Sequence, residues 1–273
     1  MSYYTYQNII SLENLLQAWK EFLNGKRGRK DVEGFERNLM EHIISLHQDL
    51  VNKTYAHSNY HAFKISDPKP RDIHKAGVRD RLLHHAIHRR LYPFFDKLFI
   101  ADSFSCRLYK GTHKAMDRLK KFAYKASHNN RKTMYILKCD IRKFFANIDH
   151  KILIDILKKY IPDKDTTELV AKIIDSFSSN PISAMADMQK GLPLGNLTSQ
   201  LLVNIYMNEF DQFMKHKLKV KYYVRFADDF VILSENKNEL SVLLRYIEVF
   251  LREKLKLELH PDKVYIKTVA SGV

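Results

Sequence analysis

The sequence predicts an α+β fold whose mainly antiparallel sheet is covered on one face by helices. From Thr133 onward the hydrophobic pattern gives the order strand, helix, helix, strand, strand, helix, strand, which fits a split βαβ arrangement. Before that point the pattern is largely helical. The chain has no internal repeat, and 8 Gly and 7 Pro in 273 residues mark no obvious linker. We therefore expect the two parts of the chain to pack against each other.

Three amphipathic helices are expected in the first hundred residues. They span about 11–24, about 33–51, and from about 79 to the residue before Pro93. Ser11 is placed as the N-cap of the first helix, and Gly25 begins the segment that breaks it. Pro93 is expected to end the third helix, because proline has no backbone N–H to donate. An extended piece is expected near 60–74.

The second half of the chain carries the expected sheet. Its elements are a strand at 133–141, helices at about 147–160 and after 196, a hairpin at 222–233, a helix at about 237–256, and a last strand pair at 255–259 and 263–269. Asn236 and Glu239 stand at the spacing of a capping box before the long helix. The hairpin places Asp228 and Asp229 at its tip, and Asp140 ends the first strand.

The chain is strongly basic, and the charge is uneven. Lys plus Arg number 46 against 31 Asp plus Glu, a formal net charge of +15. Residues 51–135 hold 19 basic and 6 acidic side chains, whereas residues 136–273 hold 21 and 18. A basic surface interleaved with aromatic rings favours nucleic acid as the partner. A solvated basic face over core aromatics is the alternative.

Composition excludes several classes of protein. A chain of this length with 45% hydrophobic residues can bury a sizeable core, so disorder is excluded. No stretch approaches the roughly 18 apolar residues of a membrane helix, and the start lacks a secretory signal, so we expect a cytoplasmic protein without a membrane partner. Cys106 and Cys139 cannot build a disulfide framework or a zinc site. His84, His85 and His88 lie on a basic helix and are interpreted as RNA-facing or structural.

Three carboxylates, those of Asp140, Asp228 and Asp229, are candidate metal ligands. Their strands can be neighbours in the sheet, which brings like charges to one edge. Divalent cations relieve such repulsion, and an oxygen-only ligand set favours Mg²⁺, or Mn²⁺, over zinc. Two such ions about 3.5–4 Å apart support attack by a 3′-hydroxyl with pyrophosphate as leaving group. An Asp-Asp turn without a catalytic role is the alternative.

Several segments resemble the motifs of reverse transcriptases. KCDIRKFFANIDH, GLPLGNLTSQLLVNIYMNEFD, YVRFADDFVIL and LELHPDKVYIK have the order and spacing of the palm motifs, and KPRDIHKAGVRDRLLHHAI with SFSCRLYKGTHKAM resembles the fingers blocks. The resemblance covers about 60–273 and is nearest to bacterial retroelement enzymes: group II intron, diversity-generating retroelement and unassigned bacterial reverse transcriptases. It implies a right-hand polymerase fold. The implied parts are an N-terminal helical extension at 1–59, fingers at 60–135, and a palm at 136–273 with an inserted fingers-like segment at about 161–195.

The resemblance implies an active site that holds two Mg²⁺ ions. It makes Asp140 and Asp228 the principal metal ligands and Asp229 the third carboxylate, with help from the backbone carbonyl of Ile141. Lys263 occupies the position of a lysine proposed in the family to protonate pyrophosphate. On the residues alone, a structural or solvent-exposed lysine stays open.

The resemblance also implies the substrate contacts. Phe145 corresponds to a steric gate whose ring fills the space of a ribose 2′-hydroxyl. Lys69 and Arg71 resemble cations that grip the triphosphate, and Leu194 with Gly195 corresponds to a turn that contacts the nucleotide. A core role for Phe145 and a solvated basic turn stay open on the residues alone. The basic residues expected to contact nucleic acid are Arg79, Arg81, Arg107 and Lys110.

Three features depart from the family pattern. Phe226 replaces the usual tyrosine of the YxDD turn and keeps its ring. Leu194 stands where retroviral and group II intron enzymes carry glutamine, and LGNLTSQ resembles the pattern of diversity-generating retroelements; loss of a polar nucleotide contact predicts reduced fidelity. The sequence ends at Val273, where the family continues into a thumb. We therefore expect the thumb to be absent, either because the sequence is a fingers and palm piece or because an accessory protein supplies the clamp, with weak, salt-sensitive binding.

The leading interpretation is the core of an RNA-directed DNA polymerase that uses an RNA template, a DNA or RNA primer and dNTPs. The alternative is an RNA-binding ribonucleoprotein module with vestigial or partner-dependent polymerase activity, against which the presence of all three acids argues. A nucleotide cyclase would need a Gly-Gly-acid turn, which is absent. Arg225, shortly before the acids, is either a structural cation or an outward-facing strand residue.

Overall fold

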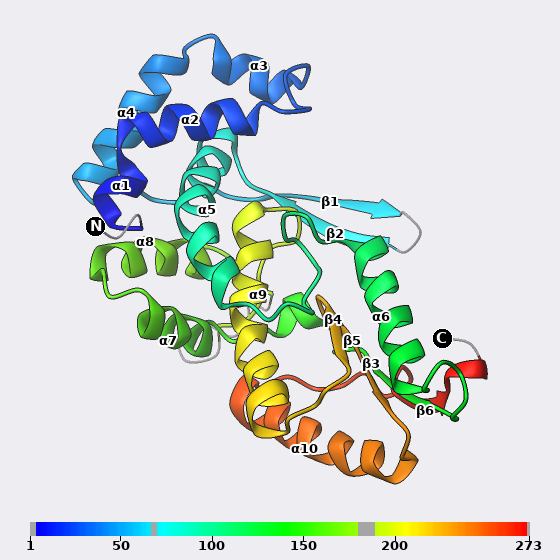
Figure 1. Cartoon of the computed structure of the whole chain (residues 1–273). Coiled ribbons are helices and arrows are strands. Elements are labelled where there is room, and N and C mark those ends of the chain that lie inside the picture. The colour runs from blue at the N-terminus through cyan, green and yellow to red at the C-terminus, as the bar shows by residue number, and fades with distance from the viewer. Residues whose placement is uncertain (1–3, 67–69, 180–188, 272–273) are drawn as a thin grey trace. The chain divides into compact units, whose positions relative to one another are not determined.

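The computed structural model describes residues 4–66, 70–179 and 189–271 (Figure 1). The chain divides into two compact units, and each is described by itself. Unit 1 consists of Met1–Phe95 with His150–Leu202, and unit 2 consists of Asp96–Asp149 with Val203–Val273. No helix in the described ranges is both long enough and apolar enough to cross a bilayer.

Unit 1 is mainly helical. Its helices are α1 (Tyr6–Ile10), α2 (Leu12–Phe22), α3 (Lys30–Glu36), α4 (Leu39–Val51), most of α5 (Val78–Leu98), α7 (His150–Tyr160), α8 (Lys164–Asp175) and the start of α9 (Leu197–Gln212). Ser11 caps α2 as predicted, because its hydroxyl accepts a hydrogen bond from Asn14 N at 3.2 Å. The single helix predicted at 33–51 is wrong. Asn38 leaves the helical conformation, with φ −120° and ψ 38°, and so separates α3 from α4.

Helix α5 continues through Pro93 to Leu98, so the prediction that Pro93 ends this helix is wrong. A proline inside a helix costs about 3 kcal/mol, because one main-chain hydrogen bond is lost. Leu91, Tyr92 and Phe95 are all buried around it. Burying side chains of this size contributes about 1.5–3 kcal/mol each, which outweighs the lost bond.

The extended piece predicted near 60–74 is an antiparallel hairpin in unit 1. Strand β1 (His61–Ser66) pairs with β2 (Pro70–Lys75), and the register places Ile65 opposite Arg71. Every residue of β1 is exposed. The hairpin therefore presents Arg71 on a strand with much of its surface open to solvent.

Unit 2 is built on an antiparallel sheet with the order β4-β5-β3-β6. The strands are β3 (Tyr135–Cys139), β4 (Tyr223–Phe226), β5 (Asp229–Ser234) and β6 (Tyr265–Thr268). The other elements are α6 (Thr112–Ala126), the 3-10 helix η1 (Phe144–Asn147), the rest of α9, the π-helix η3 (Phe213–Lys217), α10 (Lys237–Leu255) and the 3-10 helix η4 (Val269–Ser271). The central strands β3 and β5 are far apart in the sequence, as the predicted split βαβ arrangement requires.

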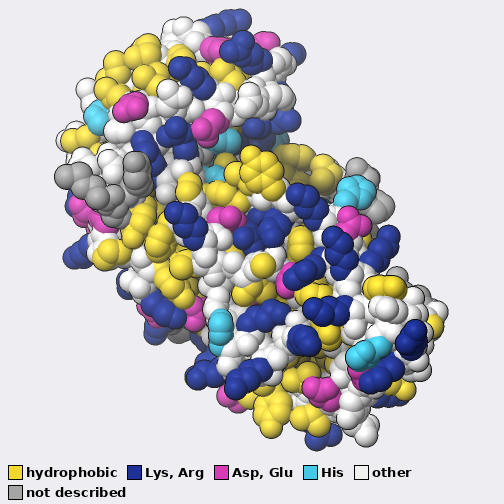
Figure 2. Space-filling model, in the orientation of Figure 1, with side chains coloured by type: hydrophobic (Ala, Val, Ile, Leu, Met, Phe, Trp, Pro, Cys, Tyr) yellow, Lys and Arg dark blue, Asp and Glu magenta, His cyan; other side chains and the backbone are white. Residues whose placement is uncertain are grey.

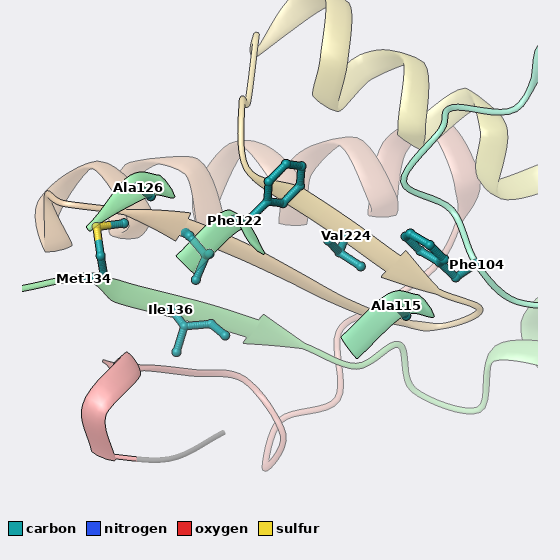
Figure 3. Close-up of a cluster of buried hydrophobic side chains, with 8 residues drawn as sticks. Phe104, Ala115, Phe122, Ala126, Met134, Ile136 and Val224 are labelled. Carbon is teal, nitrogen blue, oxygen red and sulfur yellow. The ribbon is translucent and has the colours of Figure 1, made fainter. Parts of the chain in front are cut away.

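Helices cover both faces of this sheet, so the prediction of one covered face is wrong (Figure 3). On one face, α6 packs into a cluster of Phe104, Ala115, Phe122, Ala126, Met134, Ile136, Val224 and Leu233. On the other face, the ring of Phe210 in α9 lies 5.1 Å from that of Phe230 and 6.1 Å from that of Tyr223. Successive strand side chains point to opposite faces. Both sets are apolar here, so both faces need a cover.

The division into units differs from the predicted boundary between 60–135 and 136–273. Phe104 and the apolar face of α6 complete the core of the sheet, so residues 96–135 group with the sheet rather than with the β1-β2 hairpin. Helices α7 and α8 group instead with the N-terminal helices: the backbone N–H of Tyr6 donates to Asp163 Oδ2 at 2.6 Å.

The predicted strand pair at 255–259 and 263–269 does not form. Strand β6 pairs with β3 instead, with Leu137 opposite Ile266. Helix α10 ends at Leu255, and its C-cap Lys256 adopts the left-handed conformation. The following residues run beside the chain that leaves β3, where Ile141 and Leu259 form an isolated bridge. The edge of β3 opposite β5 thus pairs with β6, and the chain just after β3 pairs with residues 258–260.

Candidate active site

Asp140, Asp228 and Asp229 lie at one edge of the unit 2 sheet. Asp140 directly follows β3, and Asp229 begins β5. These two strands are hydrogen-bonded neighbours in which Cys139 pairs with Phe230, so the residues one step beyond this pair face each other. Asp228 lies in the turn between β4 and β5. The structure therefore brings the three predicted acids together within one unit.

The turn that carries Asp228 has an unusual backbone conformation. Phe226 pairs with Asp229, which leaves Ala227 and Asp228 as the two turn residues. Ala227 has φ +55°, in the left-handed region. A residue with a Cβ atom pays about 1–2 kcal/mol for this conformation, so neighbouring contacts must hold the turn in place.

Burial and like charge raise the pKa of Asp228 in the turn and of Asp229 at the start of β5. Burial raises the pKa of Asp228 to about 6, and the charges of Asp140 and Asp229 add to the rise. Burial also raises the pKa of Asp229, to which Asp140 contributes and which Lys138 opposes. In both cases burial is the larger cause, and the neighbouring carboxylates add to it.

Lys263 lies at the same edge. Its Nζ atom is 2.9 Å from Asp140 Oδ2, and this hydrogen bond raises the pKa of the lysine. The lysine side chain is 45% exposed, whereas that of Asp140 is 12% exposed. An ammonium group half open to solvent is thus held beside the acids.

The residues of this edge fit a hard divalent cation. Within the described ranges, no three His, Cys, Asp or Glu side chains stand ready as ligands of one ion. The acids lie at the ends of two strands, and the ammonium group of Lys263 is bound to one acid, Asp140. Their donor atoms are all oxygen, and burial, together with the charges of Asp140 and Asp229, raises the pKa of Asp228. Mg²⁺ or Mn²⁺ prefers oxygen ligands and would offset the like charge of such a site.

Ile141 and Phe145 follow Asp140 and lie in the same unit. Arg142 N donates to Glu258 O at 2.9 Å, and His260 N donates to Asp140 O at 2.7 Å. In an antiparallel pair of this kind the N–H and C=O of the residue between, Ile141, point away from the partner segment. Its carbonyl is therefore not used by residues 258–260.

Two adjacent rings in η1 have different surroundings. Phe144 is buried, with 3% exposure, whereas Phe145 is only partly buried. The ring centroids are 5.6 Å apart and nearly perpendicular. Phe144 is therefore the core residue of the pair, and Phe145 keeps part of its surface exposed.

The turn at Leu194 is attached to strand β2 in unit 1. His74 N donates to the carbonyl of Leu194 at 3.1 Å, and the side-chain amide of Asn196 donates to the carbonyl of His74 at 2.8 Å. Leu194 itself is partly buried. The predicted nucleotide-contacting turn and the strand that carries Arg71 thus form one element.

Gly195 is required in this turn. Its φ is +103°, and a Cβ atom there would lie 2.9 Å from Ile73 Cγ2. Arg71 is exposed on the same strand. Lys69 lies outside the described residues.

Two of the predicted nucleic-acid contacts, Arg79 and Arg81, form ion pairs in unit 1. Arg79 pairs with Asp49. Arg81 pairs with Asp31 at 2.5 Å, and its side chain is only 10% exposed. Both guanidinium groups are therefore bound by carboxylates of unit 1 in this structure.

The other two, Arg107 and Lys110, hold the 100–110 loop of unit 2. Arg107 is 5% exposed and donates to Asp96 Oδ1 at 2.7 Å and to three backbone carbonyls. Lys110 donates to the carbonyl of Ala101 at 2.7 Å and is partly buried. Figure 2 shows many other Lys and Arg side chains on the face in view, with fewer acids among them.

Of the histidines on α5, His84 is structural and does not face RNA. His84 is 1% exposed, and neither ring nitrogen has a hydrogen-bond partner within the described residues. Burial lowers the pKa of His84 to about 3, and that of His85 and of His88 to about 4. His85 and His88 are partly buried.

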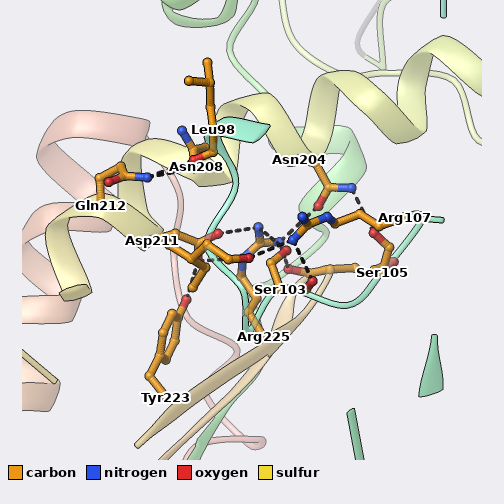
Figure 4. A network of polar contacts seen from close by, with 12 residues as sticks. Leu98, Ser103, Ser105, Arg107, Asn204, Asn208, Asp211, Gln212, Tyr223 and Arg225 are labelled. Carbon is orange, nitrogen blue, oxygen red and sulfur yellow. Dashed lines mark hydrogen bonds and ion pairs between the residues drawn. The ribbon is translucent and has the colours of Figure 1, made fainter. Parts of the chain in front are cut away.

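A buried polar network around Arg225 was not predicted as a whole (Figure 4). Arg225 is fully buried and pairs with Asp211 of α9. Asn204, Asn208 and Asp211 are all buried and recur at i, i+4 and i+7 on α9. This polar stripe on an otherwise apolar helix was the available sequence signal.

Solved structures of telomerase share this fold. The apo telomerase of Candida tropicalis, truncated from its C-terminal domain, matches with a TM-score of 0.54 and 14% identity over 77% of this chain and 50% of that one. The Candida tropicalis telomerase in complex with a TWJ fragment of telomeric RNA matches with a TM-score of 0.54 and 13% identity over 84% and 45%. The chain has the right-hand polymerase fold.

Curated relatives of the sequence include proteins encoded by introns. Protein YkfC of Escherichia coli is 21% identical over 88% of this chain and 73% of its own length. The group II intron-encoded protein LtrA of Lactococcus lactis is 23% identical over 97% and 52%. This chain thus spans about half the length of LtrA.

The family model described as reverse transcriptase (RNA-dependent DNA polymerase) matches residues 64–271. The chain belongs to this family. It contains the core of an RNA-directed DNA polymerase.

Proposed function

We propose that this chain catalyses RNA-templated DNA synthesis. The primer 3′-oxygen attacks the α-phosphorus of a dNTP, the bond between the α- and β-phosphates breaks, and pyrophosphate leaves. The observation that supports this reaction most directly is the placement of Asp140 beside Asp228 and Asp229 at the end of two paired strands. An acid cluster at a sheet edge suits charge-stabilised phosphoryl transfer.

Asp140, Asp228 and Asp229 would hold two magnesium ions, with help from the carbonyl of Ile141. When bound, these ions supply activation of the 3′-hydroxyl and stabilisation of the charge that develops on pyrophosphate. The acids of this chain orient the site through paired strands, so their spacing is set by main-chain hydrogen bonds. Manganese is the second candidate, because its ligand preference is similar.

Lys263 and Phe145 have complementary roles in the proposal. The ammonium group of Lys263 lies 2.9 Å from Asp140 Oδ2, so it is beside the acids, where it can donate a proton to the leaving pyrophosphate. The ring of Phe145, partly open beside buried Phe144, excludes a ribose 2′-hydroxyl and selects deoxyribonucleotides.

The turn at 194–195 and the β1-β2 hairpin bind the incoming nucleotide. Arg71, together with Lys69, grips the triphosphate. Leu194 offers an apolar contact where a glutamine would fix the nucleotide by a hydrogen bond, so base selection is loosened and fidelity is reduced. Gly195 permits the close approach of this turn to β2.

The proposed partners are an RNA template, a DNA or RNA primer and dNTPs, in the cytoplasm of a bacterial cell. The group II intron-encoded relative favours a retroelement as the biological setting. Lys110, which is partly buried, and the exposed basic side chains supply phosphate contacts, whose effect falls steeply with salt. An accessory protein or a thumb domain would supply additional grip on the duplex.

Primer extension on poly(rA) with an oligo(dT) primer, dTTP and Mg²⁺ tests the proposal. We expect the wild-type protein to extend the primer and Asp228→Ala to have no activity. If the wild type binds the RNA and does not extend the primer under any divalent cation, the chain is an RNA-binding module with a vestigial active site.

A further inference from the structure

Arg225 is a fully buried cation whose hydrogen bonds are all made by unit 2. Its Nε donates to Asp211 Oδ1 at 2.8 Å and its Nη2 to Asp211 Oδ2 at 2.6 Å, so the two side chains form a bidentate pair. Both are 0% exposed. Tyr223 adds a third donor to the carboxylate, at 2.7 Å. The carboxylate of Asp211 thus accepts three hydrogen bonds from side chains inside the protein.

The remaining donors of Arg225 reach three other parts of unit 2. Nη2 donates to Ser103 Oγ at 3.1 Å, and Nη1 donates to Asn204 Oδ1 at 3.4 Å and to the carbonyl of Ala227 at 3.0 Å. A guanidinium group has five N–H donors, and these five bonds account for all of them. The last one goes to the turn that carries Asp228.

The bond to Ala227 holds a strained part of the active site. Ala227 has φ +55°, and Asp228 is the next residue. The backbone of Arg225 is also fixed on both sides, since its N–H donates to Asp102 O and its carbonyl accepts from Phe104 N, each at 3.0 Å. The turn is therefore anchored through the arginine side chain to α9 and to residues 102–104 (Figure 4).

Stability alone does not explain a buried ion pair at this position. Replacing such a pair by apolar side chains of similar volume is often neutral or stabilising. A Met-Leu pair would fill the space, but it would leave the carbonyl of Ala227 without a donor. The hydrogen bond to the turn is therefore a contact that the arginine makes and an apolar pair cannot make.

We propose that Arg225, held by Asp211, is a positioning residue for the catalytic turn: it anchors the carbonyl of Ala227 and thereby sets where Asp228 lies. This proposal rests on the proposed polymerase function. Arg225 does not touch the substrates, and it acts through the turn. Since reacting groups must be placed to within about 1 Å, the loss of the anchor affects turnover and metal binding more than nucleotide affinity.

The test compares three variants with the wild type. Arg225→Lys keeps the charge but cannot reach both Asp211 and the Ala227 carbonyl with a planar fork. The triple variant Asp211→Leu, Tyr223→Phe, Arg225→Met removes the pair without leaving a buried charge. Tyr206→Phe is the control, because it removes one buried hydrogen bond of α9, to Leu255 O at 2.6 Å, away from the turn.

Three quantities are measured for each variant: the Tm, the Mn²⁺ dissociation constant by electron paramagnetic resonance, and kcat with KM for dTTP in primer extension. We expect Arg225→Lys and the triple variant to fold, to bind Mn²⁺ several-fold more weakly, and to lose about 10–100-fold in kcat with KM nearly unchanged. Tyr206→Phe is expected to lower the Tm only.

Wild-type Mn²⁺ affinity and kcat in the triple variant, or in Arg225→Lys, would overturn the proposal. The Mn²⁺ measurement separates this outcome from failure of the proposed function. If the wild type binds Mn²⁺ but extends no primer, polymerase activity is wrong, and weakened Mn²⁺ binding in the variants still supports the positioning role.

Discussion

The Nζ atom of Lys263 lies 2.9 Å from a carboxylate oxygen of Asp140, although 123 residues separate them. The contact depends on the segment after α10, where His260 N also donates to Asp140 O at 2.7 Å. The segment after α10 connects this helix to β6 and also carries Lys263. It delivers an ammonium group to the acids of the sheet edge.

Lys263→Met is expected to lower kcat in primer extension by about 100-fold, since loss of a general acid typically costs this much or more. The lysine is half exposed, so the free energy of unfolding should change by less than about 1 kcal/mol. Lys267→Met, four residues further on, is the control and should retain wild-type turnover. Equal kcat values for the two variants would remove the proton-donor role.

Asp228→Asn is expected to abolish primer extension and to raise the free energy of unfolding without metal by about 1–2 kcal/mol at pH 7.5. The pKa of Asp228 is raised to about 6, so the charged form is disfavoured in the folded protein, and this cost grows as the pH rises from about 4 to 6. An asparagine side chain carries no charge, so this cost is absent in the variant. Urea unfolding at pH 7.5 and at pH 4.5 measures the difference, which should be smaller at the lower pH. An equal or lower stability of Asp228→Asn at pH 7.5 would contradict the repulsion.

Phe145→Ala is expected to admit ribonucleotides, because the space of the 2′-hydroxyl is opened. We expect the ratio of kcat/KM for dTTP to that for UTP to fall by at least about 10-fold. Phe144→Leu is the matched control: it alters a buried ring, so it should cost about 1 kcal/mol or more of stability and leave the ratio unchanged. If Phe144→Leu changes the ratio as much as Phe145→Ala does, neither ring is a gate.

Leu194→Gln is expected to lower the error rate of DNA synthesis by restoring a polar contact to the nucleotide. Sequencing of cDNA made by the two proteins on one RNA template provides the comparison. Leu194→Met, which keeps the contact apolar, controls for repacking against β2. Indistinguishable error spectra for all three proteins would dismiss the role of Leu194 in fidelity.

Acid should destabilise unit 1 through its buried histidines. The pKa of His84 is lowered to about 3 and that of His85 and of His88 to about 4, whereas an unfolded histidine titrates near 6.5. The unfolded chain therefore binds more protons, and stability that is present above about pH 6.5 is lost as the pH falls toward 4. For His84 the loss between pH 7.5 and pH 5 is about 2 kcal/mol.

His84→Leu should make the free energy of unfolding depend less on pH. Urea unfolding followed by a probe in unit 1 measures this. His113→Leu, on α6 in unit 2, is the control and should leave the slope unchanged. A slope that is identical in wild type and His84→Leu would show that the histidine does not titrate as its burial requires.

The acid edge was predictable because it follows from local patterns. Alternating apolar residues on both sides of Asp228 and Asp229 predict a hairpin, and the strand that ends at Asp140 has the same apolar character. Antiparallel pairing then places strand ends side by side. The three acids are thus brought together by rules that act along short stretches of chain.

The Arg225–Asp211 pair was not predictable in the same way. Arg225 lies between Val224 and Phe226 on its strand, so its side chain points to the opposite face of the sheet from theirs. The sequence pattern does not say whether that face is buried or exposed. Which one occurs depends on α9 and on residues 102–104, which approach only in the folded unit. The same dependence on tertiary packing explains why α5 continues through Pro93 and why both faces of the sheet are covered.

Asp140→Asn in the poly(rA) primer-extension assay with Mg²⁺ tests the shared metal site most directly, because Asp140 comes from a different strand than the other two acids. We expect this isosteric change to leave the fold intact and to reduce dTTP incorporation by at least about 1,000-fold, as Asp228→Asn does, while the surface variant Asp155→Asn keeps full activity. Wild-type incorporation by Asp140→Asn would show that the three acids do not act as one site.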